Sequence, residues 1–598
     1  MSNVKLEKIR KLIGQGEYLS AYDSAISQAE LCSDKDEFHY LAVLALARSG
    51  ATTRAQKRFD EFYFADSDNE DYAALGARLA KDLALNSINQ DERVMLFKQS
   101  AEQYQSIFER TGGYYTAINA ASLYKLSGDT DLAHTLANKT RELCEQEPQG
   151  HGVGEYYRLV SLAEAAVVLD DLETAKLLLI AAKEHVGNDY AAMATTRRQL
   201  ALLIPAQKIS FLDALTPPCV IHFCGHMMSP SNDSGRFLPK SEQAVKSAIT
   251  KQLAENDIGF GYGSLANGAD ILFAESLLER GAKLHIILPF DMEEFIDVSV
   301  RPAGEEWTNR FYHCIDEADF VSYSCDGRYL GDNTLFHYAT RLATGLALQK
   351  ANNLQTTVKQ MAVWDGEETT GAAGTYADIQ SWQQKKYESV LLSSLNGERL
   401  PAPPIRKLEP LEFSGSQRRA HAMLFGDVKG FSKLSDEQIP SFVEQLFGAL
   451  ADVLQSFDTS ILSTNTWGDG LFVVFEDALS ASQCAIALQI AMQNIDLASI
   501  GLPSHLALRL GVHYGPIYEL NDPVLHRTNY FGAHVTKTAR IEPITPEGEV
   551  YVTRQLAAEL ALVDGNEFTT EYVGVMPTAK KYGDMPMYLL RSSQKDSV

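Results

Sequence analysis

Two aspartates in the last third of the chain stand in contexts that suit metal-dependent chemistry. Asp427 ends an apolar, strand-like run, HAMLFGD, and Asp469 lies in a Gly-Asp-Gly turn between the runs TNTW and LFVVF. A strand-end carboxylate and a hairpin-turn carboxylate can lie on adjacent strands, where they form a hard-oxygen site for Mg²⁺ or Mn²⁺. Glycines beside them let backbone N–H groups approach phosphate oxygens closely. The pattern therefore predicts a divalent-metal site that faces phosphate.

Five segments, in order, resemble the motifs of class III adenylate and guanylate (nucleotidyl) cyclases. FGDVKGFS resembles the first metal-binding motif, NTWGDGLFVVF the second, LRLGVHYGPIYE the next strand, NYFGAHVTKTARIEPITPEGEVYVT the segment with the transition-state residues, and AKKYGDMPMYLL the closing motif. The likeness spans residues 418–592 and implies an α+β ferredoxin-like cyclase domain. It also implies an enzyme that converts a nucleoside triphosphate into the 3′,5′-cyclic monophosphate and pyrophosphate for signalling.

The resemblance assigns the metal and phosphate contacts to particular positions. Asp427, Val428 and Asp469 correspond to the positions that hold two Mg²⁺ or Mn²⁺ ions per site, in the two-metal arrangement of in-line phosphoryl displacement. The substrate-binding loop that follows the first aspartate is formed by Gly430, Phe431 and Ser432.

The transition-state residues are implied by the same likeness. Arg540 matches the arginine that stabilises charge around the α-phosphate, and Lys580 matches a phosphate-contacting lysine. In the family these two residues and the base-reading residues come from the subunit opposite the aspartates. Because this domain carries both sets, the resemblance implies a homodimer with two equivalent sites.

Three positions depart from the usual family pattern. Thr536 stands where an asparagine usually orients the ribose, so the rate is in question. Asn465 and Asn529 occupy two base-reading positions, and an amide both donates and accepts, so neither selects a base. Family frequency favours ATP and hence an adenylate cyclase. The alternatives are a guanylate cyclase, a pyrimidine cyclase of phage defence, and a non-catalytic nucleotide-binding or scaffold protein.

The region before these motifs divides into two further folds. Residues 1–205 show Ala and Leu at three- and four-residue intervals, with Gly- or Asp-containing breaks, which predicts an all-α helical solenoid. YYTAINAASLYKLSGD and SLAEAAVVLDDLETA resemble tetratricopeptide-like regions, including the TRAF-binding region of stress-activated kinases. Such a solenoid implies a protein partner, which the sequence does not identify.

Residues 216–385 alternate strand-like runs with helical stretches, which predicts an α/β Rossmann-like doubly wound sheet. The turn GSLANGAD follows a strand and opens a helix, where backbone N–H groups favour anions. The region resembles the SLOG group of Rossmann-like domains, which implies a nucleotide-derived ligand, with Gly225, His226 and Glu275 as candidate contacts. Proline-containing residues 386–417 are predicted to be a linker.

The amino-acid composition limits which partners and which cellular compartment are expected for the protein. The net charge of −25 argues against an extended nucleic-acid-binding face, which needs clustered Lys and Arg. The seven cysteines are dispersed without a CxxC pair, which favours a reducing compartment and offers no zinc spacing. No apolar run approaches the roughly 20 residues of a membrane span, and no apolar signal core opens the sequence. These features predict a cytoplasmic protein with no membrane partner.

Overall fold

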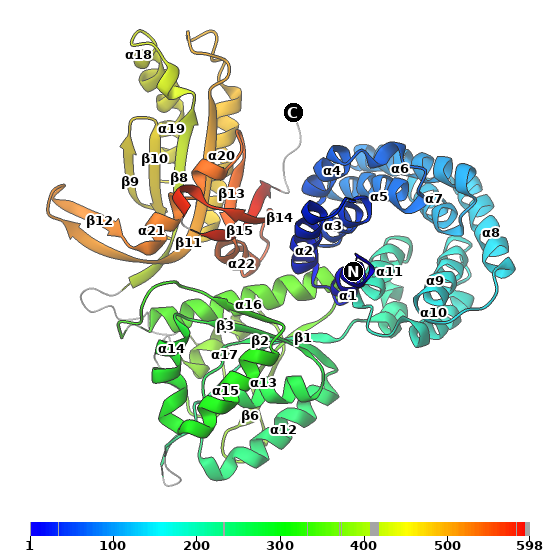
Figure 1. Cartoon of the computed structure of the whole chain (residues 1–598), viewed down its shortest axis with the longest axis horizontal. Helices are drawn as coiled ribbons and strands as arrows, with labels where there is room; N and C mark the ends of the chain where they lie inside the picture. The colour runs from blue at the N-terminus through cyan, green and yellow to red at the C-terminus, as the bar shows by residue number, and fades with distance from the viewer. Residues whose placement is uncertain are drawn as a thin grey trace.

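Three regions of different secondary structure follow one another along the chain and meet around the long helix α16 (Thr334–Leu354) (Figure 1). The computed structural model describes residues 2–33, 35–230, 234–331, 333–369, 371, 374–406, 418–581 and 583–592. The predicted fold class is confirmed, since an all-α region precedes an α/β region and then an α+β region. Among the described helices, none combines the length and the apolar character needed to cross a bilayer.

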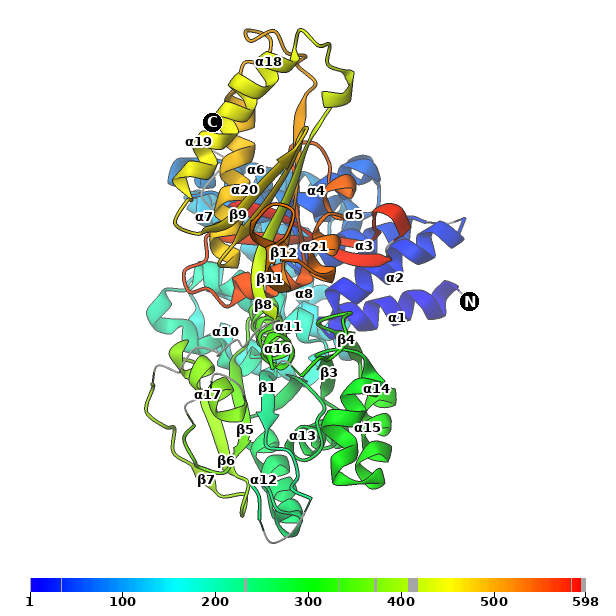
Figure 2. The same ribbon diagram turned by 90° about the vertical axis from the view of Figure 1, so that its left-hand side faces the viewer.

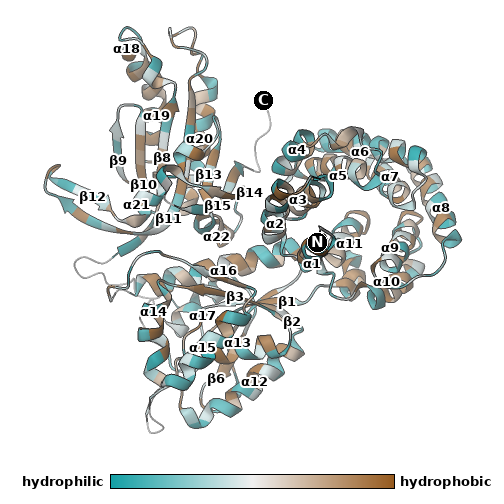
Figure 3. Ribbon diagram, viewed as in Figure 1, coloured by the Kyte–Doolittle hydropathy of each residue, from teal (hydrophilic) through white to brown (hydrophobic). Residues whose placement is uncertain are grey.

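The first region is an arc of antiparallel helices in which α1 comes back into contact with α11 (Figure 1). Bands of hydrophobic and hydrophilic residues alternate along these helices (Figure 3), as expected when one face of each helix packs on its neighbours. The helices are α1 (Ser2–Gly14), α2 (Tyr18–Leu31), α3 (Asp36–Arg48), α4 (Thr52–Glu61), α5 (Glu70–Asn86), α6 (Gln90–Thr111), α7 (Tyr114–Ser127), α8 (Thr130–Gln146), α9 (Gly152–Val168), α10 (Leu172–Val186) and α11 (Tyr190–Leu203).

The polar breaks in the sequence are helix caps. The side chains of Asp129, Asp171 and Asp189 each accept a hydrogen bond from a backbone N–H in the first turn of the next helix, at 3.2, 3.1 and 2.9 Å. Gly128, which ends α7, has a φ of 91°, a left-handed conformation that glycine adopts without strain. The helix starts at Asp129 and Asp171 therefore lie at Gly- or Asp-containing breaks of the sequence.

The second region is a seven-stranded sheet of order β4-β3-β2-β1-β5-β6-β7, parallel except for β7. Alternate residues of its strands enter two cores, one with α13 and one with α16; Ile221 and Val220 are examples. The elements are β1 (Cys219–Gly225), α12 (Glu242–Glu255), β2 (Ile258–Gly263), α13 (Ala269–Glu279), β3 (Lys283–Leu288), α14 (Met292–Phe295), α15 (Glu305–Glu317), β4 (Phe320–Tyr323), α16, β5 (Val358–Trp364), α17 (Thr375–Gln384), β6 (Ser389–Ser393) and β7 (Arg399–Leu400).

The linker predicted for residues 386–417 starts too early. Its first part contains β6 and β7, which extend the second sheet beside β5. The apolar run in β6 is only three residues long, Val390 to Leu392, and gives too short a pattern to be recognised as a buried strand. Residues 407–417 lie outside the described residues.

The third region is an eight-stranded sheet with the path β14-β15-β13-β11-β8-β10-β9, from which β12 pairs with β11. Helix α20 packs on the centre of this sheet against β8, β10 and β11. The elements are β8 (Arg418–Lys429), α18 (Ile439–Ser441), α19 (Gly448–Ser456), β9 (Ile461–Trp467), β10 (Gly470–Phe475), α20 (Ala478–Asn494), β11 (Ala507–Asp522), β12 (Arg527–Phe531), α21 (Ala533–Thr538), β13 (Val550–Thr553), α22 (Arg554–Ala561), β14 (Phe568–Pro577) and β15 (Asp584–Ser592).

Helix α16 joins the second region to the third. Both views place it between the two sheets (Figures 1 and 2). The Tyr338 hydroxyl donates to the carbonyl of Tyr514 in β11 at 2.7 Å, and the Arg341 guanidinium forms a two-pronged ion pair with Glu559 of α22. Such a fork-on-fork pair fixes orientation as well as distance.

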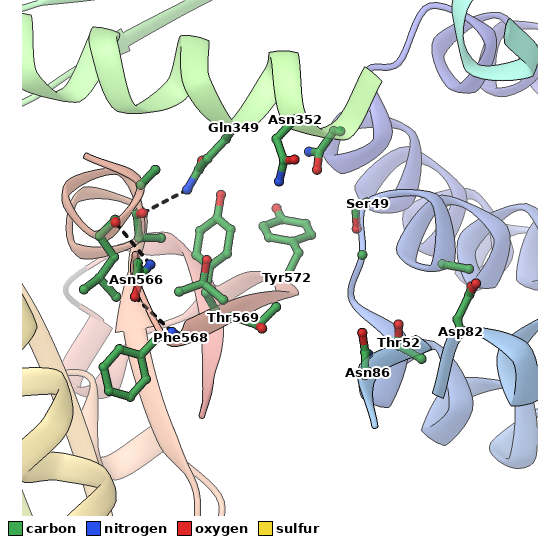
Figure 4. A pocket seen from close by; sticks show the side chains of 18 of the residues that line it. Ser49, Thr52, Asp82, Asn86, Gln349, Asn352, Asn566, Phe568, Thr569 and Tyr572 are labelled. Carbon is green, nitrogen blue, oxygen red and sulfur yellow. Dashed lines mark hydrogen bonds between the residues drawn. The ribbon is translucent and has the colours of Figure 1, made fainter. Parts of the chain in front are cut away.

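The helical arc contacts both other regions. At one contact, Lys350 of α16 donates to Glu17 at 2.6 Å. At another, the Glu571 carboxylate of β14 accepts the backbone N–H groups of Thr53 and Arg54 at the start of α4, both at 3.0 Å, where the helix dipole favours negative charge. A pocket of about 450 Å³ lies where the arc, the end of α16 and strands β14 and β15 meet (Figure 4).

Candidate active site

The structure brings the two predicted carboxylates together at one end of the third sheet. Asp427 lies near the end of β8, which pairs with β10 through Gly426 opposite Leu471. Asp469 lies in the two-residue turn between β9 and β10, whose first residue, Gly468, has a φ of 66°. The tight turn folds β9 back on β10 and leaves the Asp469 carboxyl within hydrogen-bonding reach of Asp427.

The pKa of Asp469 reflects the proximity of the two carboxyl groups. Partial burial raises the pKa of Asp469 to about 6, and the hydrogen bond to Asp427 and its negative charge add to the rise. Two ionised carboxylates within hydrogen-bonding reach of each other repel unless a proton or a cation lies between them. The pair is therefore a place where a cation would be stabilised.

Two further charged residues belong to the site and were not predicted. Arg509 of β11 stands directly opposite Asp427 in the sheet, and its guanidinium lies 2.6 Å from the Asp427 carboxylate and 2.8 Å from Glu542. Burial raises the pKa of Glu542 to about 7, although Arg509 opposes the rise. An arginine inside the apolar run LRLGV is a signal that could have indicated Arg509, whereas Glu542 offers none.

The donor set fits a hard divalent cation. Within the described ranges, no group of three or more His, Cys, Asp or Glu side chains is arranged to hold a metal ion. Mg²⁺, however, is usually bound by one or two carboxylates together with water and substrate phosphates. Asp427 and Asp469 supply two carboxylates, and Val428, whose side chain is buried, could add only its backbone carbonyl.

The loop after Asp427 is held close to the carboxylate pair. Gly430 has a φ of 97°, and a side chain there would come within 3.0 Å of Leu506. Phe431 packs on Phe442 with ring centroids 4.7 Å apart, and Ser432 is exposed. The phenyl ring therefore anchors the loop, while its backbone and Ser432 remain on the surface.

The two predicted base-reading residues are neighbours. The Asn465 side-chain amide donates to the Asn529 side-chain oxygen at 3.5 Å, a long hydrogen bond. Arg527 donates to the Asn465 oxygen, and Asn529 donates to Asp522 at 2.9 Å. The four side chains form one polar network on β9, β11 and β12, with both donors and acceptors to offer a base.

The remaining predicted residues lie on the surface of the same region. Thr536 is exposed on α21, and Arg540 is half-buried just after that helix. Within the described chain, no carboxylate lies within the 4.0 Å of an ion pair from the Arg540 guanidinium. Lys580 is exposed with a φ of 57°, a left-handed conformation that is uncommon for a residue with a side chain.

Comparisons with known proteins agree with two of the predicted resemblances, those of the last and the first regions. Residues 416–592 match the family described as adenylate and guanylate cyclase catalytic domain, and residues 19–124 match the one described as Tetratricopeptide Repeats-Sensor. "Putative adenylate cyclase 3" of Rhizobium meliloti (strain 1021) is 32% identical over 142 residues, which are 23% of this chain and 22% of that protein. "Adenylate cyclase" of Schizosaccharomyces pombe is 23% identical over 228 residues, 35% of this chain and 12% of that protein. The matched segments thus span less than a quarter of either relative.

Solved structures of cyclases are similar to less than a third of this chain. The adenylyl cyclase CyaB from P. aeruginosa is 19% identical and covers 31% of this chain and 100% of its own, with a TM-score of 0.27. The guanylyl cyclase Cya2 is 24% identical and covers 30% of this chain and 95% of its own, with a TM-score of 0.25. From the family matches, residues 416–592 are a class III adenylate and guanylate cyclase catalytic domain, and residues 19–124 are a tetratricopeptide-type sensor region.

Proposed function

We propose that the protein is a nucleotidyl cyclase that converts ATP into 3′,5′-cyclic AMP and pyrophosphate. The ribose 3′-oxygen would lose its proton and attack the α-phosphorus, and the bond from that phosphorus to the β-phosphate oxygen would break. The observation that carries the proposal is the meeting of Asp427 and Asp469 beside Arg509. This arrangement offers cation sites and a fixed positive charge at one place, as a triphosphate requires.

Asp427, Asp469 and the Val428 carbonyl would hold Mg²⁺ or Mn²⁺. Divalent ions bound there supply charge neutralisation of the triphosphate and lower the pKa of the attacking hydroxyl. When metal binds Asp427, Arg509 keeps Glu542 as a second partner, at 2.8 Å, so it need not lose all pairing. Gly430 and Ser432 would contact the phosphates from the adjoining loop.

Arg540 and Lys580 would act on the substrate of a second subunit, and Thr536 would orient the ribose. The lack of a carboxylate near Arg540 within the described chain supports this role, because a guanidinium held for a phosphate should not already be neutralised. We therefore propose a homodimer with two equivalent sites. Exposed apolar side chains at the end of β9 and in the turn between β11 and β12 also support a second copy; they include Trp467, Val524 and Leu525.

The polar network of Asn465 and Asn529 would read the base. Because each amide can donate or accept, the network suits the edge of adenine but also admits other bases. GTP and the pyrimidine triphosphates are the alternative substrates. A domain that binds nucleotide without turnover is the second candidate, favoured by Thr536 in place of the family's usual asparagine.

The assay that separates these candidates uses the purified full chain. It is incubated with Mn²⁺ and each of ATP, GTP, CTP and UTP in turn, and cyclic products are separated by chromatography. The proposal expects cyclic AMP and an equal amount of pyrophosphate. A different cyclic nucleotide as the product would show that the corresponding triphosphate, and not ATP, is the substrate. Nucleotide binding without any cyclic product would establish the non-catalytic alternative.

We further propose that the first two regions regulate the cyclase. The hydrogen bonds and ion pairs of α16 with β11 and α22, and of Glu571 with α4, support this proposal. A movement of either region would reach the third region through these contacts. A partner protein on the helical arc remains part of the proposal.

A further inference from the structure

A second pocket, of about 400 Å³, lies in the α/β region at the carboxyl ends of its strands. Its walls come from the end of β1, the loop between β2 and α13, and the first turns of α16 and α17. Strand β1 has β2 on one side and β5 on the other, so the order of the sheet reverses there. Such a reversal opens a crevice in which α/β proteins bind ligands.

Two carboxyl groups line this pocket. Asp270 is only 7% exposed, and its Oδ1 atom has no hydrogen-bond partner among the described residues. Asp378 lies close enough to Asp270 for the charge of Asp270 to act on it. Burial raises the pKa of Asp270 to about 7 and that of Asp378 to about 8, with the charge of Asp270 adding to the second rise.

Histidines complete the polar lining. His222 is 2% exposed and His337 lies on the first turns of α16. The Nδ1 atom of each lacks a hydrogen-bond partner in the described chain. The Ser264 hydroxyl of the same lining is likewise unpaired among the described residues. Buried polar atoms are normally paired, so these four atoms at one cavity point to a missing molecule with several hydrogen-bonding groups.

The lining is unsuited to phosphate. The described residues that line the pocket include no Lys or Arg. Arg341, one turn along α16 from His337, is committed to its ion pair with Glu559. A phosphate placed beside Asp270 and Asp378 would be buried without a cationic side chain to balance its charge.

The glycine-containing turn is also already satisfied. Asp270 sits in the first turn of α13 and accepts the backbone N–H of Ala266 at 3.1 Å, so the helix start carries its own anion. Other N–H groups of this corner are used within the protein: Met228 donates to Asn267 at 2.8 Å, and Ala269 donates to the His226 carbonyl at 3.1 Å. The anion site predicted from GSLANGAD is therefore filled from within.

We propose that this pocket binds a small, non-phosphorylated amine or amino-heterocycle that donates N–H groups to Asp270 and Asp378. The unpaired ring nitrogens of His222 and His337 offer further contacts, and Phe223 and Phe336 supply apolar walls. A nucleotide-derived ligand, as expected from the sequence, fits only without its phosphates.

The three contacts expected from the sequence behave differently. Gly225 lines the pocket. His226 is held by Asp365 at 3.1 Å and by Thr375 at 3.2 Å. Glu275 is paired with Arg310 at 2.6 Å and is not among the residues that line the pocket, so it does not contact a ligand bound there.

The pocket shares a wall with the cyclase contact, and this step rests on the proposed function. His337 and Thr340 of α16 line the pocket, whereas Tyr338 and Arg341 of the same turns bind β11 and α22. A ligand that shifts or stiffens this end of α16 therefore acts directly on the third region. The pocket would sense an amine and adjust the rate of cyclisation.

Isothermal titration of the full chain tests the binding. The probes are agmatine and adenosine, with AMP as the phosphate-bearing match to adenosine and inorganic phosphate as a simple anion. The variants are Asp270→Asn and Asp378→Asn, and Asp316→Asn, an exposed aspartate of α15, is the control. Circular dichroism of each variant establishes that it is folded.

We expect agmatine or adenosine to bind with an affinity that falls at least about tenfold in Asp270→Asn or Asp378→Asn and is unchanged in Asp316→Asn. AMP and phosphate should show no binding that depends on Asp270. The inference is overturned if neither amine shows Asp270-dependent binding, or if AMP binds in an Asp270-dependent manner as tightly as adenosine. If adenosine binds only at the cyclase site, its affinity will not change in Asp270→Asn, and this result would also count against the inference.

A rate measurement tests the coupling separately. The initial rate of the full chain is measured with and without the amine that binds, in the wild type and in Arg341→Ala. We expect a change of at least about twofold in the wild type, and retained binding without that change in Arg341→Ala. An equal response in Arg341→Ala overturns the α16 route. A chain with no cyclase activity overturns the proposed function and leaves the binding result standing.

Discussion

The molecule contains two pairs of aspartates, each pair gathered at one site, and the two sites differ in what surrounds the carboxyl groups. Asp427 and Asp469 lie at one end of the third sheet, with Arg509 2.6 Å from the Asp427 carboxylate. Asp270 and Asp378 lie in the pocket of the second region, where no Lys or Arg is among the described lining residues. Burial raises the pKa of Asp469 to about 6 but raises those of Asp270 and Asp378 to about 7 and 8.

A pair of carboxyl groups does not by itself specify a ligand. A partly exposed pair beside an arginine can hold a metal ion and face a polyphosphate, because both signs of charge are present. A buried pair without a cation favours the protonated acids, or a ligand that brings its own N–H donors.

The largest effect is expected from loss of one carboxylate of the first pair. Asp427→Asn should lower the rate of cyclisation about 10³-fold, since metal ions contribute several kcal/mol of charge stabilisation in the transition state. Asp436→Asn, an exposed aspartate close by in the sequence, should keep the wild-type rate. Product is measured by chromatography at saturating Mn²⁺. A wild-type rate in Asp427→Asn would remove the first pair from catalysis.

A mixed dimer should recover part of that loss. Asp427→Asn and Arg540→Ala should each be inactive alone, because each spoils both sites of a homodimer. Mixed in equal amounts, they should regain about a quarter of wild-type activity, since half of the dimers are mixed and each has one intact site. The measurement is the rate of the mixture after subunit exchange. No recovery in a mixture that demonstrably exchanges subunits would place Arg540 outside the partner's site.

A smaller effect is expected in the second pair. The pKa of Asp378 is raised to about 8 from a usual 3.8, so the folded protein binds more protons than the unfolded chain between these values. Stability from this group is therefore complete below about pH 4 and is lost as the pH rises through about 8. The free energy of unfolding of Asp378→Asn, taken relative to that of the wild type, should therefore be about 1–3 kcal/mol higher at pH 8.5 than at pH 5.

Thermal unfolding of the full chain at the two pH values measures this change. Asp316→Asn, with its exposed side chain, is the control and should follow the wild type at both. The neighbours that could mask the effect are Asp270, His222, His337 and Cys224, all of which line the same pocket. If Asp378→Asn loses as much stability as the wild type between pH 5 and pH 8.5, the Asp378 carboxyl is already ionised in the folded protein at pH 5, and this prediction is wrong.

Local patterns predicted much of the fold and part of the site. The helix caps at Asp129 and Asp171 and the turn around Asp469 are written in a few adjacent residues, and the structure has them where they were expected. The family motifs placed Asp427 and Asp469 near one another because their spacing fits a strand, a helix and a hairpin.

What the sequence did not predict depends on long-range pairing. Arg509 joins Asp427 only through the register of β11 with β8, which no local pattern specifies. The contacts of α16 with β11 and α22 join residues that are far apart in the chain. The anion site expected at GSLANGAD failed for a local reason, because Asp270 within that segment occupies the helix start itself.

Titration of the full chain with Mn²⁺, followed by the electron paramagnetic resonance of free Mn²⁺, tests the central contrast most directly. We expect Mn²⁺ binding in the wild type, loss of that binding in Asp469→Asn, and wild-type binding in Asp378→Asn. Binding that survives in Asp469→Asn but disappears in Asp378→Asn would contradict it, because the metal would then belong to the buried pair.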